Sequence, residues 1–224
     1  MRTLGIFAGA TVAGALAVRV ARSRHRRILH PDGRSFTGEL EIWGLDRPVG
    51  SSLVDRPGRY PVTVRISKGA GTRPGRPDVL GVAVRAAGTG DLLLSTMGGG
   101  RLLRHLPMPR RSFDTRYGSI LAYRTGDRRK VYLTAEPDPA GPPLGATLGS
   151  VTAAAHEGAR LLLGVGGGGA FGRVTFGAPL PAPVDAALAF DPIRNAPADL
   201  HPAGVIHRTR ALAYPLSQRW RHAR

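Results

Sequence analysis

Short apolar or alternating segments recur along this chain, and turns rich in glycine and proline separate them. The chain has 224 residues, of which 31 are glycine and 19 are proline, a content that favours turns over long helices. The segments with the length and pattern of β-strands are residues 36–43, 60–67, 79–86, 91–96, 131–135, 173–176 and 187–190. Many short strands joined by turns are typical of a closed or nearly closed antiparallel barrel. The sequence therefore predicts an α+β fold built on an antiparallel β-barrel.

Helices are expected in three places, namely residues 4–26, residues 151–164, and a last segment from Pro202 or Gly204 to about Trp220. Pro215 lies inside the last segment, where it costs a hydrogen bond and kinks the axis. The glycine-rich run 164–172 lacks the Lys-Ser or Lys-Thr of a phosphate-binding P-loop. We therefore predict that this run is a flexible connector.

Three side chains of the last predicted helix fall on one face. At about 100° per residue, Arg210, Tyr214 and Arg221 lie within roughly 40° of one another. A guanidinium one turn away favours the phenolate form of a tyrosine. A phenolate oxygen is a hard anionic ligand for ferric iron and a known axial ligand of haem. Tyr214 is therefore a candidate iron ligand, and the alternative is a core tyrosine whose hydroxyl is hydrogen-bonded nearby.

The stretch Arg210-Ala-Leu-Ala-Tyr-Pro-Leu-Ser-Gln-Arg-Trp-Arg221 resembles the haem-ligating motif of catalases, Arg-x-x-x-Tyr-Pro followed by (His or Gln)-Arg-x-Arg. Arg27-Ile-Leu-His-Pro-Asp-Gly33 is similar to the catalase segment that carries the distal histidine. Pro61-Val-Thr-Val-Arg-Ile-Ser67 is similar to the strand Pro-Val-x-Val-Arg-Phe-Ser. Residues 80–85, 90–94 and 190–197 resemble the next two strands and the lead-in to the tyrosine helix. The resemblance implies a shortened catalase-like barrel with flanking helices.

The resemblance also implies haem b, with its iron, as the cofactor. Tyr214 would ligate the iron, and Arg210 would hold the phenolate in its ionised form. Arg27, Arg65 and Arg221 match arginines that hold the haem propionates, a task suited to bidentate guanidinium–carboxylate pairs.

On the opposite side of the haem, the resemblance makes His30 the distal base. An imidazole both accepts and returns a proton near neutral pH, as the cleavage of a peroxide requires. Ser67 would orient the ring of His30. Catalases carry a peroxide-binding asparagine directly after the strand that residues 90–94 resemble. At that position this chain has Ser95 or Thr96. We take Thr96 as the candidate, because its hydroxyl can donate a hydrogen bond to a peroxide.

Leu216-Ser217 replaces the Asp-Thr that usually follows the Tyr-Pro of catalases. This replacement and the absence of the asparagine are compatible with several functions. The protein is either a peroxide-dependent oxidoreductase, acting on hydrogen peroxide or on an organic or lipid hydroperoxide, or a catalase-fold protein that has lost haem. In the second case it would serve as a binding or membrane-associated module.

The charge is strongly basic, at +17 with 32 lysine and arginine residues. Only Lys68 and Lys130 are lysines, so 30 of the 32 are arginines, which indicates a coding bias. A nucleic-acid binder is a third hypothesis, but the arginines are scattered and aromatic residues make up only 6%. No specific nucleic-acid binding is therefore expected. The absence of cysteine excludes disulfides and thiolate-held metals.

Residues 1–26 are treated as a segment apart from a haem-binding domain at 27–224. The apolar run 4–18 is short for a membrane span, which needs about 20 residues. It is a helix packed on the domain, a peripheral helix on an anionic membrane, or a signal peptide. We prefer the first, which predicts a cytoplasmic protein and leaves membrane association and secretion open.

Overall fold

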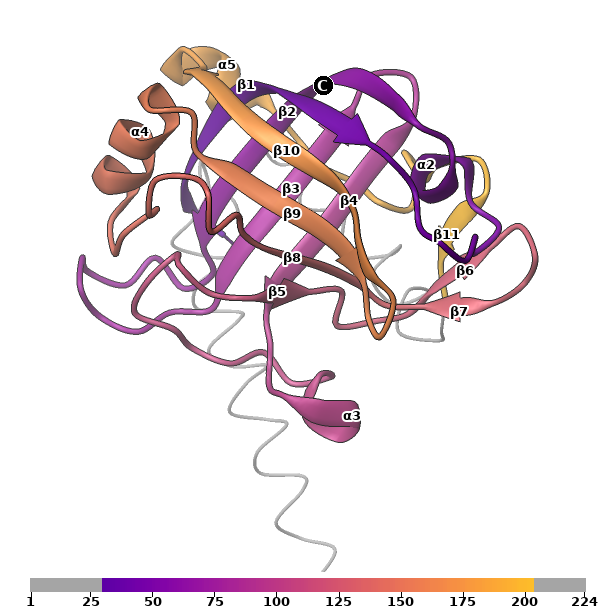
Figure 1. Ribbon diagram of the computed structural model, residues 1–224. Helices are drawn as coiled ribbons and strands as arrows, with labels where there is room; N and C mark the ends of the chain where they lie inside the picture. Colours follow the sequence, from indigo (N-terminus) through magenta and orange to yellow (C-terminus); the bar gives the residue numbers. More distant parts are fainter. Residues whose placement is uncertain (1–29, 204–224) are drawn as a thin grey trace, which may run out of the picture.

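The computed structural model describes residues 30–203 and is built on a closed barrel of eight antiparallel strands (Figure 1). Around the barrel the strand order is β1-β10-β9-β8-β5-β4-β3-β2. These strands are β1 (Asp32–Ile42), β2 (Gly58–Lys68), β3 (Leu80–Ala86), β4 (Gly90–Thr96), β5 (Tyr117–Gly118), β8 (Leu133–Pro137), β9 (Arg160–Val165) and β10 (Gly169–Pro179). Each barrel strand pairs with a neighbour on both sides. The predicted antiparallel barrel is confirmed.

In the described part of the chain, a small sheet and four short helices flank the barrel. The sheet has the order β11-β6-β7 and consists of β6 (Tyr123–Thr125), β7 (Lys130–Val131) and β11 (Leu200–Pro202). The helices are α2 (Ser52–Asp55), α3 (Gly100–Leu103), α4 (Leu148–His156) and α5 (Ala182–Ala187). Within residues 30–203, no helix has the length and apolar character needed to cross a membrane.

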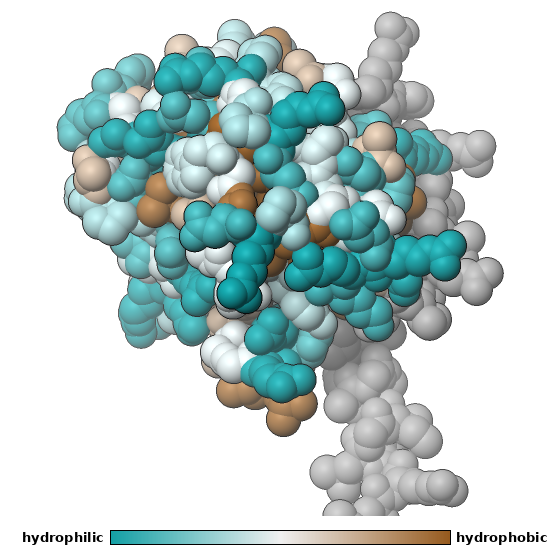
Figure 2. All heavy atoms as spheres, turned by 45° about the vertical axis from the view of Figure 1, so that its right-hand side comes forward, coloured by the Kyte–Doolittle hydropathy of each residue, from teal (hydrophilic) through white to brown (hydrophobic). Residues whose placement is uncertain are grey.

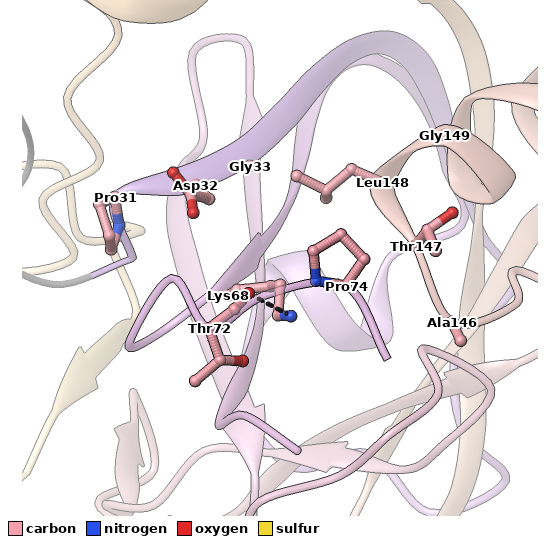
Figure 3. Close-up of a pocket in the computed structure, with 10 residues that line it drawn as sticks. All are labelled: Pro31, Asp32, Gly33, Lys68, Thr72, Pro74, Ala146, Thr147, Leu148 and Gly149. Atoms are coloured by element: carbon pink, nitrogen blue, oxygen red, sulfur yellow. Dashed lines mark hydrogen bonds between the residues drawn. The ribbon is translucent and has the colours of Figure 1, made fainter. Parts of the chain in front are cut away.

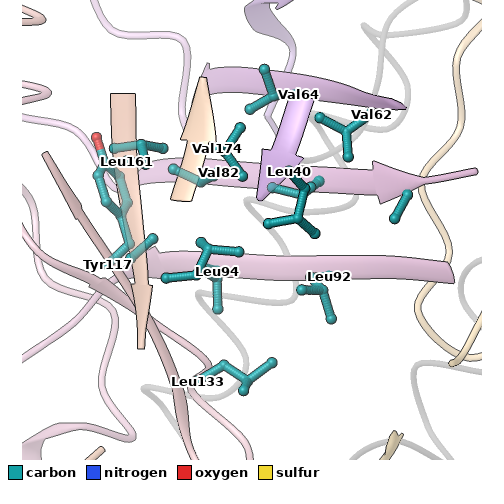
Figure 4. Close-up of a cluster of buried hydrophobic side chains, with 14 of the residues drawn as sticks. Leu40, Val62, Val64, Val82, Leu92, Leu94, Tyr117, Leu133, Leu161 and Val174 are labelled. Atoms are coloured by element: carbon teal, nitrogen blue, oxygen red, sulfur yellow. The ribbon is translucent and has the colours of Figure 1, made fainter. Parts of the chain in front are cut away.

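Side-chain alternation along the strands separates a filled interior from an outer face. On β2, β3 and β4, the interior row Ile66, Val82 and Leu94 consists of directly paired residues that are 0–3% exposed. Figure 4 shows the neighbouring leucines, valines and Tyr117 that fill the same space. The barrel is therefore a packed core, and any site formed by these strands lies on its outer face.

One predicted helix is too long, and one predicted strand is absent. The helix expected at 151–164 ends at His156, and Leu161–Leu163 belong to β9. Gly158, with φ of 78°, reverses the chain after the helix, as glycine does at many helix ends. Residues 187–190 form no strand, because α5 ends at Ala187 and an extended segment follows. Short apolar runs do not distinguish a helix from a strand.

The glycine-rich run 164–172 is a tight hairpin between β9 and β10 rather than a connector, with Val165 paired to Gly169. The predicted helices at 4–26 and 204–220 lie outside the described residues.

Candidate functional site

His30 and Ser67 meet at the end of β2. Nδ1 of His30 lies 2.9 Å from Oγ of Ser67, and the His30 amide donates to the Gly69 carbonyl at 3.1 Å. His30 has a φ of 56°, a left-handed conformation that is uncommon for residues with a side chain. Such conformations persist where surrounding contacts impose them and concentrate at functional sites. The histidine is thus held by both its backbone and its ring.

Gly81 on β3 provides the space for the imidazole. A Cβ at this position would lie 2.5 Å from Cε1 and 2.7 Å from Nδ1 of His30, closer than atoms can approach. The ring therefore rests directly against the backbone of the strand. A glycine inside a strand commonly marks such a close approach.

The strand register places a row of small residues beneath His30. Successive pairs join Gly33 to Ser67, Ser67 to Gly81, Gly81 to Ser95 and Ser95 to Gly118. Directly paired residues of antiparallel strands share a face of the sheet. Because a Cβ on Gly81 would point at His30, this whole row lies on the outer face that carries the histidine. The row crosses five strands, and its small residues leave room for the side chains of Arg65 over Gly33, His30 over Gly81 and Met97 over Gly118.

The strand register places Thr96, the residue predicted to bind a peroxide, on the opposite face of the sheet from His30. Thr96 pairs with Tyr117 in the barrel interior and is fully buried. Its hydroxyl donates to the Met108 carbonyl at 2.7 Å and accepts from the Leu80 amide at 3.0 Å. Its single proton is therefore used within the protein. Ser95, the other residue considered at this position, lies on the face that carries His30.

Arg65 lies two residues before Ser67 on the same outer face, and it is 5% exposed. Its guanidinium forms an ion pair with the carboxylate of Asp185 on α5, and Nη1 also donates to Ser35 Oγ at 3.3 Å. The Ser35 hydroxyl in turn donates to Asp185 at 2.6 Å. A buried charge in mid-strand requires a partner, and Asp185 is that partner.

Asp78 organises the loop between β2 and β3 on which His30 rests. Its carboxylate accepts from the amides of Ala70 at 2.7 Å and Thr72 at 2.8 Å. Burial raises the pKa of Asp78, but the hydrogen bonds from Thr72 and Ala70 outweigh burial and hold the pKa below its ordinary value. Asp78 is therefore ionised at neutral pH and keeps the loop closed.

Asp91 on β4, which is fully buried, anchors the segment that resembles the catalase lead-in. Arg85 donates to it through Nε and Nη2, both at 2.7 Å. The Asp191 amide and the Asn195 side chain donate to it at 2.7 and 3.1 Å. The hydrogen bond that Arg85 donates to Asp91 raises the pKa of the Arg85 guanidinium above its ordinary value. Residues 190–197 are thereby docked on the outer ends of β3 and β4.

A groove of about 520 Å³ lies beside the site, between the start of β1 and the N-terminus of α4 (Figure 3). Asp32, Lys68 and Leu148 line it from three different elements. The Lys68 ammonium donates to the carbonyls of Thr72 at 2.7 Å and Arg73 at 3.1 Å, so it fastens the same loop that Asp78 closes.

The remaining predicted site residues, Arg27, Arg210, Tyr214 and Arg221, lie outside the described residues. Across residues 30–203, no three histidine, aspartate or glutamate side chains are grouped closely enough to hold a metal ion. Among the predicted site residues that the structure describes, His30 and Ser67 are in contact.

Sequence reasoning missed three contributors to this site. Gly81 could have been found, because an isolated glycine in a strand pattern signals a close approach. Asp78 also precedes a strand, and aspartates often accept loop amides. Nothing in the sequence singles out Asp185, whose partner lies 120 residues away.

The fold matches solved structures of catalases. A fungal catalase superposes with a TM-score of 0.66 and 12% identity, over 93% of this chain and 62% of the catalase. Catalase A from Saccharomyces cerevisiae gives a TM-score of 0.64 and 13% identity, over 94% of this chain and 64% of that protein. The chain therefore has a catalase-like fold and spans less than two thirds of either catalase. At these identities the likeness shows the fold alone.

Comparison with protein-family models and with curated proteins gives no match.

Proposed function

We propose that this protein is a haem-dependent oxidoreductase that acts on a peroxide. The observation that carries the proposal is the contact between His30 and Ser67 on the outer face of a catalase-like barrel. Haem, when bound, would supply the redox chemistry of the peroxide bond. Tyr214 and Arg210 are proposed to hold the iron side, and His30 to work on the opposite side.

The hydrogen bonds of Ser67 favour one tautomer of His30. The Ser67 hydroxyl donates its single proton to the Gly81 carbonyl at 3.4 Å. It then accepts from His30, so Nδ1 carries the ring proton and Nε2 is the basic nitrogen. In the proposed reaction Nε2 takes a proton from one peroxide oxygen and returns it to the departing oxygen. Ser67 is a positioning residue, because it acts through His30.

The outer face of the barrel fits a flat group in part. Gly81 leaves room for the imidazole to lie close against the strand, and Ser95 pairs with Gly81 on the same face. Ser95 is the hydroxyl that we propose to donate a hydrogen bond to the peroxide. Arg65 fits less well as a propionate anchor, because the carboxylate of Asp185 already binds its guanidinium. The propionate contacts are therefore proposed chiefly for Arg27 and Arg221.

The test uses the full chain reconstituted with haemin. Turnover of hydrogen peroxide and of an organic hydroperoxide is measured for the wild-type protein and for His30→Gln. Loss of a general acid–base group lowers turnover by about 10²–10⁴-fold, and we expect a fall of this size for His30→Gln. Equal turnover in the two proteins, or wild-type turnover no greater than that of free haemin, contradicts the proposal.

The second candidate is a catalase-fold module without haem. The buried ion pair between Arg65 and Asp185 favours this candidate. Asp185 already binds the guanidinium that the resemblance to catalases assigns to a haem propionate. A folded wild-type protein that does not bind haemin would select this candidate.

A further inference from the structure

The loop that follows β4 exposes leucines instead of burying them. We name residues 97–108, which include α3, the leucine loop. Leu102 is 84% exposed, Leu103 51% and Leu106 53%. Among residues 30–203, only two other large hydrophobic side chains, Trp43 and Val184, are exposed. Figure 2 shows the resulting apolar surface at the lower end of the molecule, where Figure 1 shows α3 projecting from the barrel.

The leucine loop is well ordered by hydrogen bonds at its base. Thr96 and Met108 exchange two bonds, one through the Thr96 hydroxyl at 2.7 Å and one from the Met108 amide at 2.9 Å. The Gly98 amide donates to the Leu106 carbonyl at 3.1 Å. A Cβ on Gly98 would lie 2.6 Å from Cβ of Leu103, so the two arms of the loop touch. The leucines are thus presented on a fixed support.

The segment that carries the leucines is basic. Residues 92–113 contain no aspartate or glutamate, and they include four arginines, at 101, 104, 110 and 111. Arg101 and Arg111 are exposed. The Arg104 guanidinium lies 4.8 Å from the centre of the Tyr132 ring, which braces the loop against the barrel. The exposed apolar tip therefore has a positively charged rim.

We propose that the leucine loop docks this protein onto the surface of an anionic phospholipid bilayer. Leucines at the tip enter the boundary between headgroups and acyl chains, while the arginines bind lipid phosphates. The shape favours a bilayer over a protein partner, because a projecting tip enters a deformable surface without a matching pocket. Docking in this orientation brings the end of β4 that carries Ser95 towards the lipid.

The absence of cysteine from the chain allows a direct test. One cysteine is introduced into the full-length protein as Leu102→Cys, and in a control as Val184→Cys, an exposed aliphatic position on α5. Each is labelled with a polarity-sensitive fluorophore and titrated with vesicles of phosphatidylcholine, with or without phosphatidylserine. We expect a blue shift and quenching by spin-labelled lipid at position 102 with phosphatidylserine present, and neither at position 184.

A second variant tests the contribution of the leucines to affinity. Burial of a leucine side chain corresponds to about tenfold in a partition constant, so Leu102→Ser/Leu106→Ser should weaken vesicle binding by about a hundredfold. Val184→Ser should leave it unchanged.

Four results would overturn the proposal. They are no shift at position 102, equal shifts at both positions, equal binding to vesicles that lack phosphatidylserine, and a shift at position 102 that depends on protein concentration without lipid. The last result would make the loop an interface between copies of this chain.

Discussion

Oγ of Ser67 lies 2.9 Å from Nδ1 of His30, although the two residues are 37 positions apart in the chain. The contact joins β2, which carries Ser67, to His30, which lies two residues before the start of β1. Because the Ser67 hydroxyl also donates to the Gly81 carbonyl at 3.4 Å, the serine orients the ring and favours the tautomer with the proton on Nδ1. His30, together with Ser67 and Gly81 on the outer row beneath it, therefore defines the candidate site.

Ser67→Ala removes the acceptor for the Nδ1 proton. We expect the neutral His30 ring to shift towards the tautomer protonated on Nε2, which ¹⁵N chemical shifts of the imidazole report. With haemin bound, turnover of hydrogen peroxide should fall by about 10–100-fold, as expected when the partner that orients a catalytic group is lost. Ser67→Thr, which retains the hydroxyl, should recover most of the turnover. Unchanged tautomer populations in Ser67→Ala would show that the serine does not position the ring.

Gly81→Ala places a methyl group against the imidazole. Its Cβ would lie 2.5 Å from Cε1 of His30, so the ring must move. A displacement of about 1 Å costs roughly a hundredfold in rate, and we expect kcat/KM to fall by that amount. The control is Gly99→Ala, because a Cβ at Gly99 meets no atom within 4 Å and its φ is −79°. Equal kcat/KM values for the two variants would contradict the proposed position of His30.

Asp185→Ala removes the carboxylate that neutralises the buried guanidinium of Arg65. Removal of one partner of a buried ion pair typically costs about 3–5 kcal/mol, and we expect the free energy of unfolding to fall by that amount. Replacing both residues, as Arg65→Met with Asp185→Leu, should restore much of this loss. Denaturant titrations measure both effects. A change in Asp185→Ala of no more than about 0.5 kcal/mol, the range of neutral surface substitutions, would show that the pair contributes little.

Asp78 should make stability depend on pH. Its pKa is lower in the folded protein than in the unfolded chain, so its carboxylate stabilises the fold above the unfolded value of about 3.9. This contribution is lost as the pH falls through the folded pKa. We expect Asp78→Asn to lower the free energy of unfolding at pH 7 by about 1–3 kcal/mol, and the difference from wild type to shrink below about pH 4. Asp46→Asn, at an exposed carboxyl, is the control. A difference that stays constant from pH 7 to pH 3 would contradict this role.

The sequence predicted the strands between residues 36 and 96 well, because turns rich in glycine and proline separate them. It failed in the apolar run Leu92–Leu94, where residues on both faces are leucines and the pattern does not show which face is buried. Both Ser95 and Thr96 carry a hydroxyl, so the sequence does not show which of them lies on the outer face. The observed pairing of Gly81 with Ser95 decides between them.

Contacts between distant segments could not be predicted from local pattern. The barrel closes by the pairing of β1 with β10. Helix α5, which follows β10, brings Asp185 to Arg65. Neither contact has a sequence signature, because both depend on the path of the chain between the elements. The contact of His30 with Ser67 was expected only through the resemblance to catalases.

The proposed role of Tyr214 as the iron ligand decides the whole account of function. The most direct measurement is the absorption spectrum of the full chain after reconstitution with haemin, recorded for wild type and for Tyr214→Phe. We predict a Soret band of protein-bound haem in the wild type, and in Tyr214→Phe a band that is lost or clearly displaced. Identical spectra for the two proteins, or no bound haem in a folded wild-type protein, would contradict the proposed function.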